Sequence, residues 1–332
     1  MGTTRYIMSM GELSRKDHSL CYRKNDKNIY IPIENTKEIY CLNEVSINSK
    51  LLDFISAHHI IIHFFNYYGN YSGTFYPREQ FNSGRLLIKQ VEKHTNQRIE
   101  IAQNIVNGIG ENLYEILYHY YKHGKKEVKG TIDWIQNEFS NKILQTNDIY
   151  SIMSLEGELW QRFYNMFQYI LIEEFIFQKR VKRPPDNPIN ALISFGNTLL
   201  YTKTISMIYQ THLDQRISFL HEPSERRFSL SLDISEVFKP VIVFKTIFEL
   251  INNKKIKVDK HFEKKLNYCI LNEEGKRLFI EAFEERLSST FVHPKLKRKI
   301  TYQTAIKLDC YKLIKCILED QAFIPFSLKR GM

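Results

Sequence analysis

The spacing of the apolar residues changes once along this chain, close to Pro77, and that change constrains the fold more than any other feature. Before it, short runs rich in β-branched and aromatic residues alternate with turn residues, a pattern typical of strands. From about residue 86 onward the apolar residues recur at helical spacing and glycines are few, which predicts helices. We therefore expect an α+β chain: a small N-terminal β-sheet domain over 1–83, then a larger all-helical C-terminal domain over 84–332.

The pattern also predicts individual elements. In the first domain it predicts strands at 29–33, 38–42 and 60–65 and one short helix at 49–57. In the second it predicts helices near 84–107, 111–123, 128–139, 146–153, 155–178, 187–212, 233–252, 259–268, 272–287 and 300–319. Thr131 and Asn147 are candidate N-caps, and the run 122–125 resembles a helix stop. The basic, proline-rich stretch 179–188 is expected to be a loop.

Composition excludes several classes of protein. A hydrophobic content of 43% and a charged content of 25% are ordinary for a compact globular chain. No apolar run reaches eighteen residues, so we expect no membrane span. The N-terminus lacks the apolar core of a secretory signal, which predicts a cytoplasmic protein. The five cysteines never form Cys-x-x-Cys, so a zinc ribbon or disulfide framework is not expected.

The charge balance indicates a polyanionic partner. The chain has 47 Lys and Arg against 37 Asp and Glu, a net charge of +10, and such a field attracts DNA or RNA. A merely basic surface explains the balance equally well. Most basic runs fall after residue 120, where they are either solvated helix faces or contacts to nucleic acid. The candidate DNA contacts among them are Lys182, Arg183, Arg226, Arg227, Lys297 and Arg298.

Three distant stretches combine to offer a divalent-metal site. They supply Glu156, then His221, then Asp233 with Glu236. Taken singly, Glu156 is better explained as an ordinary surface glutamate, and the other two acids as residues at the positive end of a helix. Taken together, imidazole and carboxylates suit Mg²⁺ or Mn²⁺, and a metal within a basic surface suits phosphodiester chemistry. Zinc fits less well because no His-Glu-x-x-His is present.

A series of short motifs gives this chain a resemblance to a known family. In chain order they fall at 10–17, 43–48, 63–69, 73–79, 155–157, 188–196, 219–221, 229–240 and 271–276. Each is weak alone, but their order and joint presence are specific. The chain resembles CRISPR-associated protein one, the integrase and nuclease of spacer acquisition, over nearly its full length. Its overall sequence pattern is most similar to that of the branch found with type I, subtype B systems.

The resemblance implies a fold, a site and partners. It implies an N-terminal β domain with dimerisation and partner contacts, and a helical catalytic, DNA-binding domain. Glu156, His221 and Glu236 match the family's metal ligands, and Asp233 matches an acidic position beside them. One departure is visible at Phe244, where many relatives have Asp; it puts in doubt a secondary polar contact and not the three ligands.

The implied activity is insertion of new spacer DNA into the CRISPR array, through attack of a 3′-hydroxyl on repeat phosphodiesters. The implied cofactor is Mg²⁺ or Mn²⁺. The implied partners are double-stranded DNA of the spacer fragments and repeat, a second copy of the chain, the second CRISPR-associated protein, and an accessory trimming nuclease. Two other functions stay open at this point: a non-catalytic DNA-binding scaffold, and a repair nuclease that acts on branched DNA.

Overall fold

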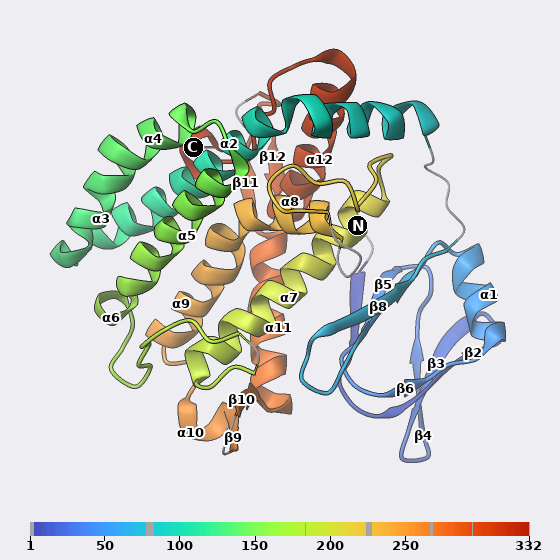
Figure 1. Cartoon of the computed structure of the whole chain (residues 1–332). Helices are drawn as coiled ribbons and strands as arrows, with labels where there is room; N and C mark the ends of the chain where they lie inside the picture. The colour runs from blue at the N-terminus through green and yellow to red at the C-terminus, as the bar shows by residue number, and fades with distance from the viewer. Residues whose placement is uncertain are drawn as a thin grey trace. The chain divides into compact units, whose positions relative to one another are not determined.

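The chain forms two compact units, Met1–Asn82 and Ser83–Met332. The computed structural model describes residues 3–77, 83–182, 184–223, 228–265, 268–293 and 295–331 (Figure 1). Three of the candidate DNA contacts, Arg183, Arg226 and Arg227, lie outside these described residues. The N-terminal region is built on sheets and the C-terminal region is mostly helical, so the predicted α+β class is confirmed.

The first unit holds two four-stranded sheets. In the first sheet β1, β5 and β7 are parallel and β8 is antiparallel to β7. Its strands are β1 (Thr3–Ile7), β5 (Thr36–Cys41), β7 (Ile61–Phe65) and β8 (Tyr71–Phe75). The strands of the second sheet, in spatial order, are β4 (Lys27–Ile31), β3 (Ser19–Lys24), β2 (Gly11–Lys16) and β6 (Val45–Ser46). Each of the three predicted strands overlaps an observed one to within about two residues.

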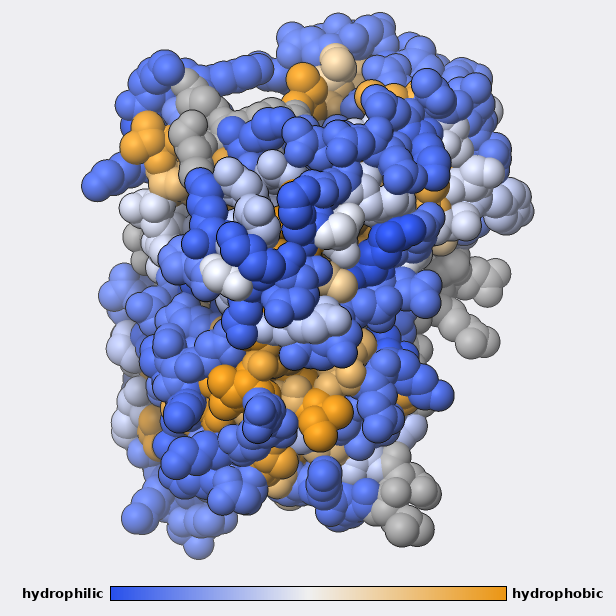
Figure 2. Space-filling model, turned by 90° about the vertical axis from the view of Figure 1, so that its left-hand side faces the viewer, coloured by the Kyte–Doolittle hydropathy of each residue, from blue (hydrophilic) through white to orange (hydrophobic). Residues whose placement is uncertain are grey.

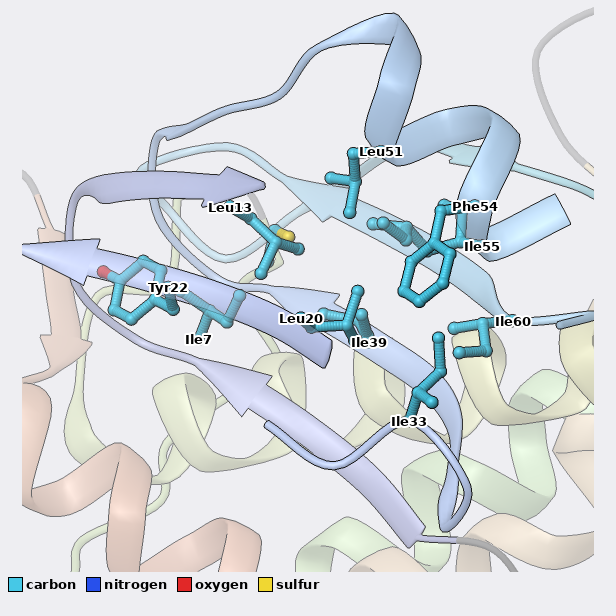
Figure 3. Packing of buried hydrophobic residues seen from close by; sticks show 12 residues of the cluster. Ile7, Leu13, Leu20, Tyr22, Ile33, Ile39, Leu51, Phe54, Ile55 and Ile60 are labelled. Carbon is cyan, nitrogen blue, oxygen red and sulfur yellow. The ribbon is translucent and has the colours of Figure 1, made fainter. Parts of the chain in front are cut away.

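One apolar core holds this unit together (Figure 3). Ile39 of β5, Leu13 of β2 and Leu20 of β3 are fully buried in it. Helix α1 (Ser49–Ala57) contributes Leu51 and Ile55 to the same core, and the Asn48 side chain caps it by accepting from the Leu51 N–H at 3.0 Å. The predicted helix at 49–57 is therefore confirmed.

The second unit is a helical assembly with two small hairpins. Its helices are α2 (Gly84–Lys122), α3 (Lys129–Trp134), α4 (Ser140–Gln145), α5 (Ile149–Asn165), α6 (Phe167–Ile170), α7 (Pro188–Tyr209), α8 (Ser229–Lys239), α9 (Lys245–Asn252), α10 (Val258–His261), α11 (Glu273–Ser288), α12 (Tyr302–Glu319) and α13 (Leu328–Gly331). A π-helical segment, Pro240–Phe244, joins α8 to α9. The hairpins are β9 (Phe262–Lys265) with β10 (Tyr268–Leu271), and β11 (Thr290–Val292) with β12 (Lys299–Thr301).

Helix α2 runs without a break through residue 108, where the sequence predicted the end of one helix and the start of another; it is kinked earlier, at Gln97, whose φ of −137° and ψ of 22° are not helical. The reason for its continuity at residue 108 is tertiary: a Cβ on Gly108 would lie 2.7 Å from Pro325 Cγ, and one on Gly110 would lie 2.5 Å from Phe139 Cε1. These glycines permit close packing and do not end the helix. The predicted stop at 122–125 is confirmed, because α2 ends at Lys122 and Gly124 adopts a φ of +93°.

Other predicted boundaries were wrong. The break predicted near residue 154 is absent, since α5 runs from Ile149 to Asn165. The predicted helix at 155–178 ends early: α6 ends at Ile170, and Leu171 is extended. Asp148 and not Asn147 caps α5, its carboxylate accepting from the Ser151 N–H at 2.9 Å. Thr131 lies inside α3 and caps nothing there.

The predicted helix at 259–268 is mostly the β9–β10 hairpin, so the second unit is not all-helical. Lys265 and Tyr268 are paired across these two strands, and the ammonium of Lys265 lies 5.6 Å from the centre of the Tyr268 ring. Such cross-strand pairs stabilise a hairpin and are invisible to helical periodicity.

Among the described residues, no helix is long and apolar enough to cross a membrane. Figure 2 shows the side on which α3, α5 and α6 lie in Figure 1; most of that face is hydrophilic, and hydrophobic side chains gather in its lower half.

Candidate active site

A buried carboxylate on α8 shapes the loop that carries His221. Asp233 is fully buried. Its Oδ2 accepts from the backbone N–H groups of Phe219 at 2.6 Å and Leu220 at 2.9 Å. Its Oδ1 accepts from the His221 N–H at 3.0 Å and lies 2.9 Å from the Nδ1 of the same residue. One side chain therefore fixes three consecutive peptide groups and one imidazole.

This hydrogen bond decides which imidazole nitrogen is free. With Nδ1–H donating to Asp233, the Nε2 of His221 is left as the nitrogen that can bind a metal, an arrangement common among metal-ligating histidines. Burial alone would lower the pKa of His221. The hydrogen bond and charge of Asp233, with the charges of Glu236 and Glu156, outweigh burial and raise that pKa above its ordinary value.

Arg98 of α2 supports the same loop. Its Nε donates to the Phe219 carbonyl at 2.6 Å and its Nη2 to the Leu220 carbonyl at 3.0 Å. Its Nη1 pairs with Glu222, 2.8 Å from Oε1. The sequence analysis missed Arg98, because its partners lie more than a hundred residues away along the chain and no local motif marks it.

Glu156 lies half-buried on α5, where one hydrogen bond orients it. The indole Nε1–H of Trp160, one turn later, donates to Glu156 Oε1 at 2.7 Å. Burial, and the negative charge of Glu236, raise the pKa of Glu156 to about 7; Lys239 and His221 act in the opposite direction. Glu156, Glu236 and His221 therefore belong to one electrostatic cluster, although they come from different parts of the sequence.

Glu236 is paired with a lysine of its own helix. Its side chain is 8% exposed and accepts a short hydrogen bond from Lys239 Nζ, three residues later on α8. Lys182, from the loop between α6 and α7, lies near the same charges. Burial and the charges of Lys239 and Arg180 lower the pKa of Lys182, while Glu236 and Glu156 oppose that shift.

The donor chemistry of this cluster fits a divalent cation, but the ligands are not assembled around one point. Within the ranges that the structure describes, no group of three or more His, Cys, Asp or Glu side chains is arranged to hold a metal ion. Two mutually perturbing carboxylates and an imidazole with a free Nε2 are the oxygen and nitrogen donors that Mg²⁺ or Mn²⁺ accepts. The Lys239 ammonium now supplies positive charge beside Glu236.

The remaining DNA candidates lie elsewhere in the second unit. Lys297 and Arg298 are exposed between β11 and β12, and Lys297 adopts a φ of +53°. No contact joins either residue to the Glu156 cluster among the described interactions. Of the predicted DNA contacts that the structure describes, only Lys182 lies beside the cluster.

Phe244, where the resemblance led us to expect an aspartate, is fully buried. Its ring lies 5.5 Å from that of Trp160 and 5.1 Å from that of Phe163, centre to centre. It therefore packs beneath the indole that holds Glu156, and its role is apolar support. The doubt raised by this position does not extend to Glu156, Glu236 or His221.

Comparison with known proteins decides the family. The model of the family CRISPR associated protein Cas1 matches residues 5–285. This chain belongs to the Cas1 family. It is 45% identical to CRISPR-associated endonuclease Cas1 2 of Thermodesulfovibrio yellowstonii over 98% of this chain and 99% of that protein. The predicted family is thus confirmed; the match does not separate the branches within Cas1.

Solved structures agree with this assignment. The structure of TM1797, a Cas1 protein from Thermotoga maritima, superposes with a TM-score of 0.86 at 39% identity, over 97% of this chain and 98% of that one. A casposase bound to integration product shares the fold with a TM-score of 0.83 at 18% identity, over 100% of this chain and 95% of that one. The Cas1 fold is therefore shared along the whole length.

Proposed function

We propose that this Cas1 protein is a metal-dependent DNA endonuclease and integrase whose ion is held by Glu156, His221 Nε2 and Glu236. Relatives that match nearly the full length at 45% and 44% identity are named CRISPR-associated endonucleases, and they place this chain in the same enzyme class. The reaction we assign is insertion of spacer DNA into the CRISPR array, by attack of a 3′-hydroxyl on a repeat phosphodiester.

One observation carries the ligand assignment. Asp233 accepts three backbone N–H groups and fixes the tautomer of His221, which leaves Nε2 free beside Glu156 and Glu236. A bound divalent ion would stabilise negative charge on the scissile phosphate and lower the barrier to attack. A carboxylate that only capped the loop would need no imidazole and no two further carboxylates beside it.

The residues of the chain have separate tasks in this proposal. Asp233 and Arg98 hold the loop, so His221 keeps one orientation. Trp160 holds Glu156 in place. Lys239 and Lys182 would supply positive charge to a phosphate at this site, and Glu236 would hold a metal ion only if it gave up its pairing with Lys239.

Partners and finer assignments belong to the same proposal. A Cas6-RT-Cas1–Cas2 complex shares the fold at 21% identity with a TM-score of 0.85, which supports pairing with the second CRISPR-associated protein. We further propose DNA of spacer and repeat as substrate, a homodimer with contacts through the N-terminal unit, an accessory trimming nuclease, and a cytoplasmic location. Mn²⁺ is our choice over Mg²⁺ because a histidine is among the ligands. The branch we propose is type I, subtype B.

A strand-joining assay tests the proposal. Purified protein with its small partner, Mn²⁺, a fragment with 3′-hydroxyl ends and a repeat-bearing plasmid should give joined product. Glu156→Ala should lose it, while Glu158→Ala, two residues away on α5 and paired with Arg162 at 2.8 Å, should keep it. Equal product from wild type and Glu156→Ala would overturn the ligand assignment. Cleavage of branched DNA without the partner, and no joining, would favour the repair nuclease; specific binding with neither reaction would favour the scaffold.

A further inference from the structure

The helical unit contains a cavity that the metal proposal does not use. It lies between the C-terminal half of α2, α9 and α11 (Figure 1), and its volume is about 470 Å³. A second cavity of about 680 Å³ adjoins it, because the two share Tyr120, His123 and Asn252. Volumes of this size are typical of sites for small organic ligands.

An aromatic layer lies between this cavity and α5, the helix that carries Glu156. Phe248 lines the cavity. The same ring packs against Phe163 of α5, with centres 6.1 Å apart, and against Phe167 of α6, with centres 5.2 Å apart. None of the proposed metal ligands lines either cavity. The cavity is therefore a separate site, and what it binds is independent of the proposed metal chemistry.

The polar part of the cavity is positively charged. Lys245 and Arg286 line it together with His119 and His123. Burial and the charge of Arg286 lower the pKa of Lys245, and Glu115 opposes that shift. Glu249 is the acid in this lining, and it is already paired with Arg286, 2.8 Å from Nη2. Lys125 and Lys254 line the adjoining cavity, where Glu173 is the acid. Basic side chains outnumber acidic ones in the two linings, and this favours an anionic ligand.

A metal ion is the alternative that the two histidines suggest. His119 and His123 stand four residues apart on α2, with ring centres 4.3 Å apart. Burial is the main cause of the lowered pKa of His119, and the charges of His123 and Lys245 add to it and disfavour a further cation. His123 Nδ1 donates to the His119 carbonyl at 2.7 Å, so His119 is the neutral imidazole here that can donate a hydrogen bond to an anion.

Two buried polar atoms beside the cavity have no hydrogen-bond partner among the described residues. They are Arg286 Nε, a donor, and Asn252 Oδ1, an acceptor. A buried polar group without a partner destabilises the folded protein, and a ligand that forms a hydrogen bond with it removes that penalty. Asn252 lines both the cavity with Lys245 and Arg286 and the adjoining one, which has an apolar rim formed by 170–172.

We propose that this cavity binds a nucleotide, with the phosphate at Lys245 and Arg286 and the base beside Tyr120 and Asn252. The basic groups match a phosphate, and an aromatic side chain with an apolar rim matches the face of a base. An amide oxygen acceptor selects a base with an exocyclic amino group, which is adenine, cytosine or guanine, over a base that lacks one. The nucleotide is either free in solution or one unit of a DNA strand.

Calorimetric titration of the metal-free, full-length protein tests this assignment. We expect 5′-AMP to bind about tenfold more tightly than 5′-IMP, which lacks the amino group, and also more tightly than inorganic phosphate. Lys245→Gln and Arg286→Lys should each weaken AMP binding by about tenfold. Lys315→Gln is the matched control, because Lys315 is exposed on α12 and lines neither cavity.

The outcomes separate the two sources of the nucleotide. If a 5′-phosphorylated adenosine trinucleotide binds with the same dependence on Lys245 and AMP does not, the ligand is a strand. Absence of binding by both, equal binding of AMP and IMP, or binding unchanged in Lys245→Gln would overturn the proposal. The comparison of adenosine with inosine, as mononucleotides or as 5′-phosphorylated trinucleotides, uses the wild-type protein, so it decides the matter even where a variant fails to fold.

Discussion

The two halves of the candidate active site differ in how firmly the fold holds them. The His221 half is fixed by Asp233, which accepts from three backbone N–H groups and the imidazole, and by Arg98 on the outer side of the loop. The carboxylate half is held by single contacts: Glu156 by Trp160 and Glu236 by Lys239. The proposed nitrogen ligand is therefore held ready by the fold, while the two proposed oxygen ligands would still have to converge on an ion.

The largest effect on stability should come from a substitution in the His221 half. Asp233→Ala leaves four donors without their acceptor in a fully buried position. We expect a loss of about 3–5 kcal/mol in the free energy of unfolding, as for removal of one partner of a buried charged pair. Urea unfolding followed by circular dichroism measures it. Asp214→Ala is the control: this carboxylate is 16% exposed and pairs with Arg216, whose side chain is 73% exposed, so the loss should be much smaller.

A substitution in the carboxylate half should lower activity and leave the free energy of unfolding nearly unchanged. Glu156→Ala removes a proposed ligand that makes one side-chain hydrogen bond. Strand joining should fall by more than about 100-fold, since loss of groups that merely orient metal ligands already costs 10- to 100-fold. Unfolding should change little. A Glu156→Ala protein that unfolds as early as Asp233→Ala would show that the two halves do not differ.

The pH dependence of stability tests whether Glu156 is perturbed by its neighbours in the carboxylate half. The pKa of Glu156 in the folded protein, about 7, lies above its ordinary value of 4.5. A proton therefore binds more tightly in the folded state, and this contribution to stability is complete below pH 4.5 and is lost as pH rises through 7. Without metal, Glu156→Gln should gain stability relative to wild type across that window. Parallel curves of unfolding free energy against pH would contradict the assignment.

The smallest effect should come from Trp160→Phe. It removes the indole N–H that donates to Glu156 but keeps a ring against Phe244. We expect joining to fall by about tenfold, because only the orientation of one ligand is lost. The apparent affinity for Mn²⁺ should weaken in the same variant. If joining falls and Mn²⁺ affinity does not change, Trp160 acts on the DNA and not through Glu156.

Local pattern predicted the parts of the fold that local physics decides. Helix α1 and the end of α2 at Lys122 follow from periodicity and a glycine with positive φ. The continuity of α2 through Gly108 could not be predicted, because the residue that requires a glycine there, Pro325, is more than two hundred positions away. The β9–β10 hairpin escaped detection for a similar reason, since strand pairing is not periodic at helical spacing.

In the candidate site, too, some residues could be predicted from the sequence and others could not. His221, Glu156 and Glu236 were named from the family pattern, and the structure places their charges in one cluster. What sequence could not supply is the support: Arg98, and the contacts of Asp233 with the loop backbone, join segments that carry no shared motif. The pairing of Lys239 with Glu236 is a local i,i+3 contact, but its meaning depends on Glu156 from another helix.

The most direct measurement is an anomalous-difference map from crystals of the wild-type protein soaked in Mn²⁺. The account predicts one strong peak coordinated by His221 Nε2 and by carboxylate oxygens of Glu156 and Glu236, with Lys239 moved away from Glu236. His221 should keep its hydrogen bond to Asp233 in that map. A peak with other ligands, or no peak while Mn²⁺ still supports strand joining, would contradict the assignment of the metal to these three residues.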